Sequence, residues 1–365
     1  MRIIKKDYLY NDPFNIIFLC GHHLKKDTSD DKREILMKYC SENCSPCQPL
    51  ILEKKFNFGY NKKYLSYDHI FLNNLTKVEK LTSLFSDKII ILHETISTAA
   101  ELGLFAGNDS LKSKIYVITP DNISIEEDKI SGFIKLAFFK HGDNDQLNEP
   151  IIFYPDTIVN KTSEYKSEYY TFFHNNQISS NLGRKIDEII KPINSSKIIQ
   201  IRNSKNGIFS SNYNSLDYYI DRNKKIIIIS IGQFNLRFFL YSAMCQKECM
   251  KELGKSKLLK DHVSYIEDYC YQLLNNSVSH YSGTILKDYT VKCLIKDFPT
   301  YTFRESIGLF FYILQAIGYI GIVNEDEKEP EIRKLTFSSS MRSKDENKSL
   351  FSNIEKTSFG RLFHE

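Results

Sequence analysis

The chain of 365 residues contains no tryptophan, only five methionines and nine prolines, and no long uninterrupted apolar run. A membrane-spanning helix needs about 20 consecutive, mostly apolar residues, so we expect a protein without a membrane span. Residues 1–7 are mostly charged and lack the apolar core of a signal peptide. These absences predict a cytoplasmic protein.

Two common catalytic motifs are also missing from the sequence. There is no glycine-rich loop ending in Gly-Lys-Ser/Thr, which disfavours an ATPase, and no Gly-x-Ser-x-Gly nucleophile elbow. The formal net charge is +4 and the pI is about 8.4. This charge is compatible with a nucleic-acid partner but does not require one, because nucleic-acid-binding domains usually gather their basic residues on one surface.

Eight cysteines are present, and three of them are close together in the sequence at Cys40, Cys44 and Cys47. A structural zinc site needs four ligands, which His22 and His23 could complete only by folding back. Disulfides are rare where thiols are kept reduced. We therefore expect free thiols, and we predict neither a metal nor a cofactor.

Short apolar segments alternate with amphipathic ones in the first half of the chain. A buried strand followed by an amphipathic helix, repeated along the chain, indicates a parallel sheet covered on both faces. We predict an α/β domain of the Rossmann/flavodoxin-like kind over residues 1–158. Its expected strands are 15–21, 49–52, 88–93, 114–120 and 151–154, and its expected helices are 30–39, 74–85 and one that begins near 99.

The character of the sequence changes after residue 158. Over residues 159–365 we predict an α+β, mostly helical region, with long helices at 234–253 and 261–274. Near its end, a helix at 303–317 precedes a short strand, a charged loop and a second strand. This is the outline of a winged helix, which is found in DNA-binding domains and in domains that bind only protein.

The loop between residues 93 and 100 is the richest candidate for a site. Ligands bind outside the carboxyl ends of parallel strands, and a helix N-terminus favours an anionic group such as phosphate. With Ser97 and Thr98 as the expected cap, Glu101 falls in the first helical turn. A carboxylate there could attack the anomeric carbon of a ribose. Acidic residues are also favoured in any first turn by the helix dipole, so this position alone does not establish a role.

Several short segments, taken in their order along the chain, resemble a known protein family. These segments are residues 17–21, Leu75-x3-Glu79, residues 86–94 and Ser97-x3-Glu101-Leu102-Gly103. Together they resemble the nucleoside 2-deoxyribosyltransferase-like family, and more closely the effector (toxin) proteins of bacterial retron anti-phage systems. The similarity covers about residues 14–155 and extends more loosely to the winged-helix-like end.

The resemblance implies roles for individual residues. Glu101 matches the catalytic glutamate, which forms or stabilises a glycosyl intermediate. The implied substrate-binding residues are Gly21, His22, Glu79, Glu94, Ser97, Thr98 and Asn108.

Two departures from the family pattern concern the shape of the pocket. His22 replaces the second glycine of the opening motif, and Thr95-Ile96 replaces a Pro-Gly pair. Glycine lets the backbone approach a ligand closely. These changes therefore affect the expected identity of the substrate more than that of the nucleophile.

We therefore expect an N-glycosidase that hydrolyses the base–(deoxy)ribose bond of a nucleotide or related substrate. The resemblance implies a retron reverse transcriptase with its branched RNA–DNA molecule (msDNA) as the inhibitory partner, contacted by the C-terminal region. Two alternatives stay open, an NAD hydrolase and a non-catalytic nucleotide-sensing DNA-binding regulator. The sequence leaves the base, hydrolysis against transfer, and the oligomeric state undecided.

Overall fold

The computed structural model divides into two compact units that interleave along the chain. It describes residues 2–5, 8–10, 15–21, 31–43, 47–52, 66–67, 70–71, 75–120, 151–154, 157–160, 167–170, 173–191, 197–211, 215–317, 321–322, 334–336 and 363–364. The first unit comprises Met1–Pro13, Lys55–Phe85 and Asn194–Glu365, and the second comprises Phe14–Lys54 and Ser86–Ile193. The functional boundary expected near residue 158 stays a prediction.

The second unit is built on a five-stranded parallel sheet, as the sequence predicted. In space the strands run β4 (Cys47–Leu50), β3 (Asn15–Cys20), β7 (Lys88–Leu92), β8 (Ile115–Pro120) and β9 (Ile151–Tyr154). All four neighbouring pairs are parallel. This order is that of flavodoxin-like doubly wound sheets, in which the direction of winding reverses between the first and third strands. Here that point lies between β3 and β7.

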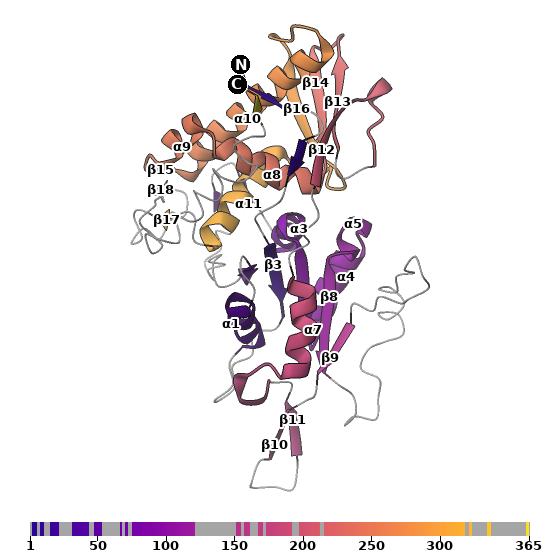
Figure 1. Cartoon of the computed structure of the whole chain (residues 1–365), viewed down its shortest axis with the longest axis vertical. Coiled ribbons are helices and arrows are strands. Elements are labelled where there is room, and N and C mark those ends of the chain that lie inside the picture. Colours follow the sequence, from indigo (N-terminus) through magenta and orange to yellow (C-terminus); the bar gives the residue numbers. More distant parts are fainter. Residues whose placement is uncertain are drawn as a thin grey trace. The chain divides into compact units, whose positions relative to one another are not determined.

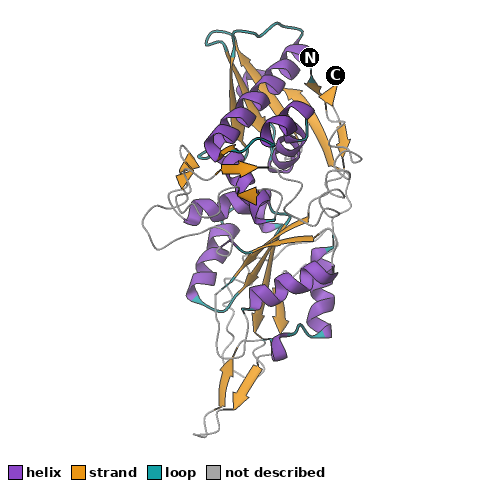
Figure 2. Cartoon of the chain, turned by 90° about the vertical axis from the view of Figure 1, so that its left-hand side faces the viewer, coloured by secondary structure: helices purple, strands orange, loops and turns teal. Residues whose placement is uncertain are grey.

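Every residue of β3 and β7 is buried, because helices cover both faces of this sheet. Side chains alternate between faces along a strand. Ile17 and Leu19 of β3 share one apolar cluster with residues of α1 (Lys32–Asn43) and α7 (Ser180–Ile190). Phe18 points to the other face, where its ring meets that of Phe105 from α4 (Ile96–Ala106) edge-on, with centroids 6.0 Å apart. In Figure 2 the strands of this sheet lie between helices.

Four small elements complete the second unit. The helix α5 (Asp109–Lys112) follows α4. The strands β10 (Thr157–Asn160) and β11 (Ser167–Tyr170) form an antiparallel pair, and the 3-10 helix η2 (His174–Asn176) precedes α7. The β10–β11 pair was not predicted from the sequence.

The first unit contains a mixed five-stranded sheet. Its order is β16 (Thr290–Ile295), β14 (Ile226–Ile231), β13 (Ser215–Asp221), β12 (Lys197–Asn203) and β2 (Tyr8–Tyr10). The pairs β14–β16 and β12–β13 are parallel, and the pairs β13–β14 and β2–β12 are antiparallel. Figure 1 labels four of these strands, β12, β13, β14 and β16.

Five helices accompany the mixed sheet in the part of the first unit that the structure describes. They are α3 (Leu75–Phe85), α8 (Gln233–Met244), α9 (Lys247–Leu253), α10 (Leu259–Ser282) and α11 (Phe303–Ala316). The single helix predicted over 234–253 is wrong, because Gln246 adopts an extended backbone and separates α8 from α9. None of the described helices is long and apolar enough to cross a membrane.

The helix α3 packs within the first unit, although its place in the sequence is among the elements of the parallel sheet. The rings of Phe85 and Phe310 stack with centroids 5.1 Å apart, which joins α3 to α11. Arg237 of α8 donates from Nη1 to the Phe85 carbonyl oxygen at 2.6 Å. These contacts account for the position of α3 in this unit.

Beyond α11, the strands β17 (Gly321–Ile322) and β18 (Lys334–Thr336) pair antiparallel, and β15 (Lys257–Leu258) adds to the free edge of β18. The charged loop expected between β17 and β18 lies outside the described residues. The winged-helix assignment therefore stays a prediction. The remaining small elements are β1 (Ile3–Ile4), paired with β19 (Phe363–His364), the pair β5 (Ser66–Tyr67) and β6 (Ile70–Phe71), and η3 (Lys205–Gly207).

Candidate functional site

The point between β3 and β7 brings together two of the loops expected to form a site. Gly21 follows the last residue of β3, and His93 and Glu94 follow the last residue of β7. Ligands of open α/β sheets bind at this kind of crevice, outside the carboxyl ends of the strands. Both loops belong to the second unit.

Gly21 occupies a position with little space for a side chain. A Cβ atom there would lie 3.2 Å from Leu92 Cβ and 3.2 Å from both Cγ and Cδ of Arg33. The glycine therefore allows the first turn of α1 to approach the end of β7 closely. Its expected contact with a substrate stays a prediction.

The first turn of α1 buries charged residues that the sequence analysis did not single out. Asp31 is fully buried and Arg33 is 3% exposed. Arg33 Nη2 donates to Asp31 Oδ2 at 2.9 Å, and the Arg33 backbone N–H donates to Asp31 Oδ1 at 2.9 Å. Buried ion pairs persist when further hydrogen bonds satisfy their charges, as here.

Lys32 joins this turn to the loop after β7. Its ammonium forms an ion pair with Glu94 Oε1, and the two side chains are only 4% and 11% exposed. The same Lys32 Nζ lies 5.7 Å from the centroid of the Phe173 ring. A pair so shielded from water holds the Glu94 carboxylate in one orientation at the edge of the sheet.

The helix α4 begins earlier than predicted. Thr95 is its N-cap, and Thr95 and Thr98 form a reciprocal capping box, so the expected start near Ala99 with a Ser97/Thr98 cap is wrong. Thr98 Oγ1 donates to the Thr95 carbonyl at 2.8 Å and accepts from the N–H groups of Glu94 and Thr95 at 3.1 and 3.0 Å. The Thr98 hydroxyl is therefore engaged in fixing the loop. Its expected contact with a ligand stays a prediction.

This earlier start moves Glu101 to the sixth residue of α4, in the second turn. The attraction of the helix dipole for acidic groups falls off within the first turn, so it no longer accounts for this glutamate. Glu101 is half-buried and its Oε2 atom is buried. Ser97, four residues earlier and on the same side of the helix, is exposed.

His93 is a further residue that the sequence analysis treated only as the end of a strand. Its backbone N–H donates to the Ile118 carbonyl at 2.8 Å, and its buried Nδ1 makes no hydrogen bond to the described part of the chain. Burial lowers the pKa of His93, which favours the neutral imidazole. A histidine at the carboxyl end of a buried strand, beside Glu94, was the signal in the sequence.

Two other predicted residues, Asn108 and Glu79, have different surroundings. Asn108 is the N-cap of α5, where its side-chain oxygen accepts from the backbone N–H and the hydroxyl of Ser110 at 2.9 and 2.6 Å. Glu79 is buried in α3, which belongs to the first unit. His22 lies outside the described residues. The substrate contacts expected of all three stay predictions.

Metal ligands do not gather in the described part of the chain, where no three His, Cys, Asp or Glu residues are close enough to hold an ion. Cys40 and Cys47 are buried, and Cys44 lies outside the described residues. The loop after β7 and the helix α4 together provide two carboxylates (Glu94 and Glu101), the neutral imidazole of His93 and the N-terminus of α4. This set suits polar binding and acid–base or nucleophilic chemistry.

The fold and this edge define a class, the doubly wound α/β proteins with a polar site where the winding reverses. Comparison with family models narrows the class, because residues 29–227 match the family described as STM3845 retron effector protein. This match spans more than half of the chain, so the chain belongs to that family. Its role therefore lies in retron anti-phage defence, in association with retron components. A comparison with curated proteins finds no relative.

Proposed function

We propose that the second unit is an N-glycosidase that cleaves the base–(deoxy)ribose bond of a nucleotide or related substrate as the effector step of retron defence. The observation that carries this proposal is the position of Glu101. It is a half-buried carboxylate in the second turn of α4, beyond the reach of the helix dipole, and α4 directly follows β7, one of the two strands between which the winding of the sheet reverses.

The steps of the reaction follow from the residues at this edge. A Glu101 oxygen attacks the anomeric carbon, or stabilises its oxocarbenium-like state, while the bond to the base nitrogen breaks. The base leaves with the electron pair and takes up a proton. Water then adds its hydroxide to the anomeric carbon and releases a proton, which frees the sugar and restores Glu101.

The neighbouring groups position the substrate. Glu94, held by Lys32, accepts hydrogen bonds from sugar hydroxyls. The exposed N-terminus of α4, with Ser97, binds phosphate. Neither role requires a metal or a cofactor.

Membership of the retron effector family supports a restraining partner. Uncontrolled hydrolysis of nucleotides would harm the host, so we infer that a reverse transcriptase with its msDNA holds the protein inactive. The C-terminal region, including its winged-helix-like end, would supply the docking surface through Lys and Arg contacts to phosphates.

Two other functions fit the same edge. Hydrolysis of NAD breaks the same kind of bond and uses a similarly placed carboxylate. A non-catalytic nucleotide sensor is favoured by the fold, since the reversal point of a doubly wound sheet binds nucleotides in many proteins without acting on them.

The test compares the unchanged chain with Glu101→Gln, and with Glu188→Gln as a matched control on an exposed residue of α7. Each is incubated with NAD, nucleoside monophosphates and deoxynucleotides, and free base is measured by chromatography. We expect base release by the unchanged chain and by Glu188→Gln, and a loss of at least about a thousandfold in Glu101→Gln. Full activity in Glu101→Gln would refute the role of Glu101. Ligand retention without turnover would favour the sensor.

A further inference from the structure

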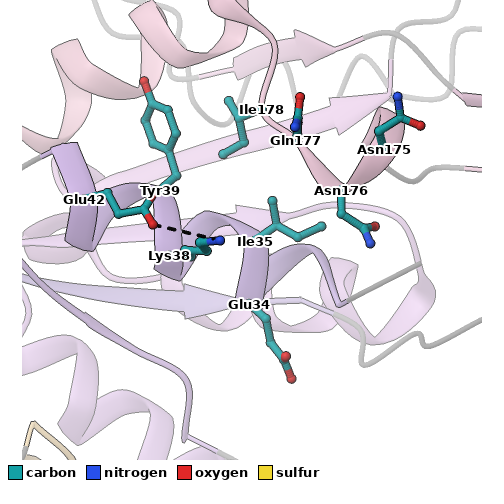
Figure 3. Close-up of a pocket in the computed structure, with 9 residues that line it drawn as sticks. All are labelled: Glu34, Ile35, Lys38, Tyr39, Glu42, Asn175, Asn176, Gln177 and Ile178. Carbon is teal, nitrogen blue, oxygen red and sulfur yellow. Dashed lines mark ion pairs between the residues drawn. The ribbon is translucent and has the colours of Figure 1, made fainter. Parts of the chain in front are cut away.

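A pocket of about 590 Å³ lies between α1 and the residues around the end of η2, within the second unit. One wall is formed by α1 and the other by residues 175–178, which lead from η2 to α7 (Figure 3). None of the residues that line it belongs to the site around Glu94 and Glu101. Its volume is in the range of pockets that hold small molecules, roughly 300–1,000 Å³.

The apolar part of the pocket consists of Ile35 and Ile178, with Tyr39 beside them (Figure 3). A hydrogen bond to α7 holds the Tyr39 side chain in position, because its hydroxyl donates to Asp187 Oδ1 at 3.0 Å. Burial and this carboxylate raise the pKa of Tyr39 to about 12, so the phenol stays protonated. A Cβ atom on Gly183 would lie 2.6 Å from the same hydroxyl, so a larger residue there would displace the Tyr39 side chain from this position.

The opposite wall carries three consecutive amide side chains, Asn175, Asn176 and Gln177. Asn175 and Asn176 both have a left-handed backbone, with φ of 50° and 54°. Glycine adopts this conformation without steric cost, and asparagine is one of the few other residues that visit it. Two successive asparagines at such positions keep two amides at the pocket where glycine would be the easier residue.

The charged groups at the pocket disfavour an anion. Glu34, Lys38 and Glu42 sum to one negative charge. Lys38 and Glu42 pair at 4.0 Å with side chains that are 77% and 61% exposed, so they stand at the rim in water. Phosphate bound inside would meet net repulsion, and the interior offers apolar contact and amides instead.

We propose that this pocket binds the uncharged heteroaromatic ring of a nucleobase. A planar ring fits against Ile35 and Ile178, and amides can both donate to and accept from the edge of a base. Any attached phosphate stays outside the rim. The base comes from a free nucleoside or from an unpaired position in a nucleic-acid strand, and the site takes part in recognition whether or not the second unit is a glycosidase.

The experiment uses the full chain carrying Glu101→Gln, so that turnover cannot consume the probe. Adenosine, guanosine, cytidine, uridine and a short single-stranded DNA are titrated by calorimetry. The test variant combines Asn175→Gly and Asn176→Gly, which remove the amides and suit the left-handed backbone. The matched control is Asn206→Gly, the same change at a left-handed position (φ 57°) in η3 of the first unit.

We expect at least one probe to bind, the double glycine variant to bind it at least tenfold more weakly, and Asn206→Gly to bind it as before. Binding of single nucleosides identifies a free ligand, and binding of the DNA alone identifies a base in a strand; both support the pocket. The proposal is overturned if no probe binds, if the double glycine variant binds as well as its parent, or if Asn206→Gly weakens binding equally.

Discussion

Each unit buries a lysine–carboxylate pair beside the ends of parallel strands, and the two pairs have different surroundings. In the first unit, Lys296 follows β16 and its Nζ lies 2.8 Å from Asp217 Oδ2, with side chains 7% and 2% exposed. The same ammonium donates to Ser215 Oγ at 2.5 Å. In the second unit, Lys32 pairs with Glu94, and the side chains are 4% and 11% exposed.

The difference lies in what surrounds each pair. Ser215, which accepts from Lys296, and Gln233 are also buried, so this cluster is shielded from solvent by the described part of the chain. The pair in the second unit adjoins a helix start where Ser97 and Ile96 are exposed, with Ile96 91% exposed. Burial of a charge pair is therefore weak evidence for function, and an accessible polar neighbourhood is the better guide.

The largest expected effect on stability concerns the pair Lys296–Asp217. Lys296→Met removes the partner of a buried carboxylate, so we expect the free energy of unfolding to fall by about 3–5 kcal/mol. Chemical denaturation of the full chain measures this change. Replacing both residues, with Lys296→Met and Asp217→Leu, should recover much of the loss. A double variant no more stable than the single one would contradict this account.

For the pair Lys32–Glu94, we expect a small effect on stability and a larger effect on activity. Because Glu94 is partly accessible, Lys32→Met should cost less stability, about 1–3 kcal/mol. A misplaced Glu94 should nevertheless lower turnover by about a hundredfold. Lys32→Arg, which keeps the charge, should restore part of the turnover. Equal turnover in the Met and Arg variants would show that Lys32 does not position Glu94.

Two glycines of the second unit should respond in opposite directions. Gly21→Ala forces a Cβ against Leu92 and Arg33, so we expect a loss of about 1–3 kcal/mol. Gly103→Ala, within α4, meets no atom within 4 Å and should stabilise the protein by about 0.5–1 kcal/mol. Thermal unfolding of both variants checks this. A stabilising Gly21→Ala would show that Leu92 and Arg33 leave room for a methyl group at this position.

The smallest effect concerns pH. Burial holds the pKa of His93 below its usual 6.5, so near and below that pH the unfolded chain binds a proton that the folded chain does not. Stability from this residue is fully present above pH 6.5 and declines as the pH falls through the lowered pKa. Denaturation midpoints between about pH 5 and 8 should depend less on pH in His93→Gln, whereas the exposed control His280→Gln should follow the unchanged chain.

The parallel sheet was predictable because β3, β7 and β8 are short apolar runs whose burial on both faces leaves a clear pattern in the sequence. The start of α4 was not, since Thr95, Ser97 and Thr98 are all good caps and only the geometry of the capping box distinguishes them. The amphipathic face of α3 was predicted correctly, but it does not specify its partner. Its contacts with α8 and α11 come from residues far along the chain.

The burial of Asp31, Lys32 and Arg33 also could not be read from the sequence. Three consecutive charged residues at a helix start are ordinarily exposed to water. Their burial depends on Gly21 and Leu92, which approach them only in the folded sheet. Candidate residues on the loop after β7 could therefore be proposed from the sequence, whereas the buried charged residues beside them could not.

The interleaving of the two units has a consequence for synthesis of the protein on the ribosome. Strand β2 pairs with β12, and the Ile4 backbone N–H donates to Ser277 at 2.9 Å. Strand β2 and Ile4 must therefore wait for partners made much later, whereas the unit that carries Glu101 is complete once residue 193 has emerged. A nascent chain can thus assemble the second unit before the first unit is complete. If the second unit has the proposed N-glycosidase activity, we expect the proposed restraining partner to be needed close to the site of translation.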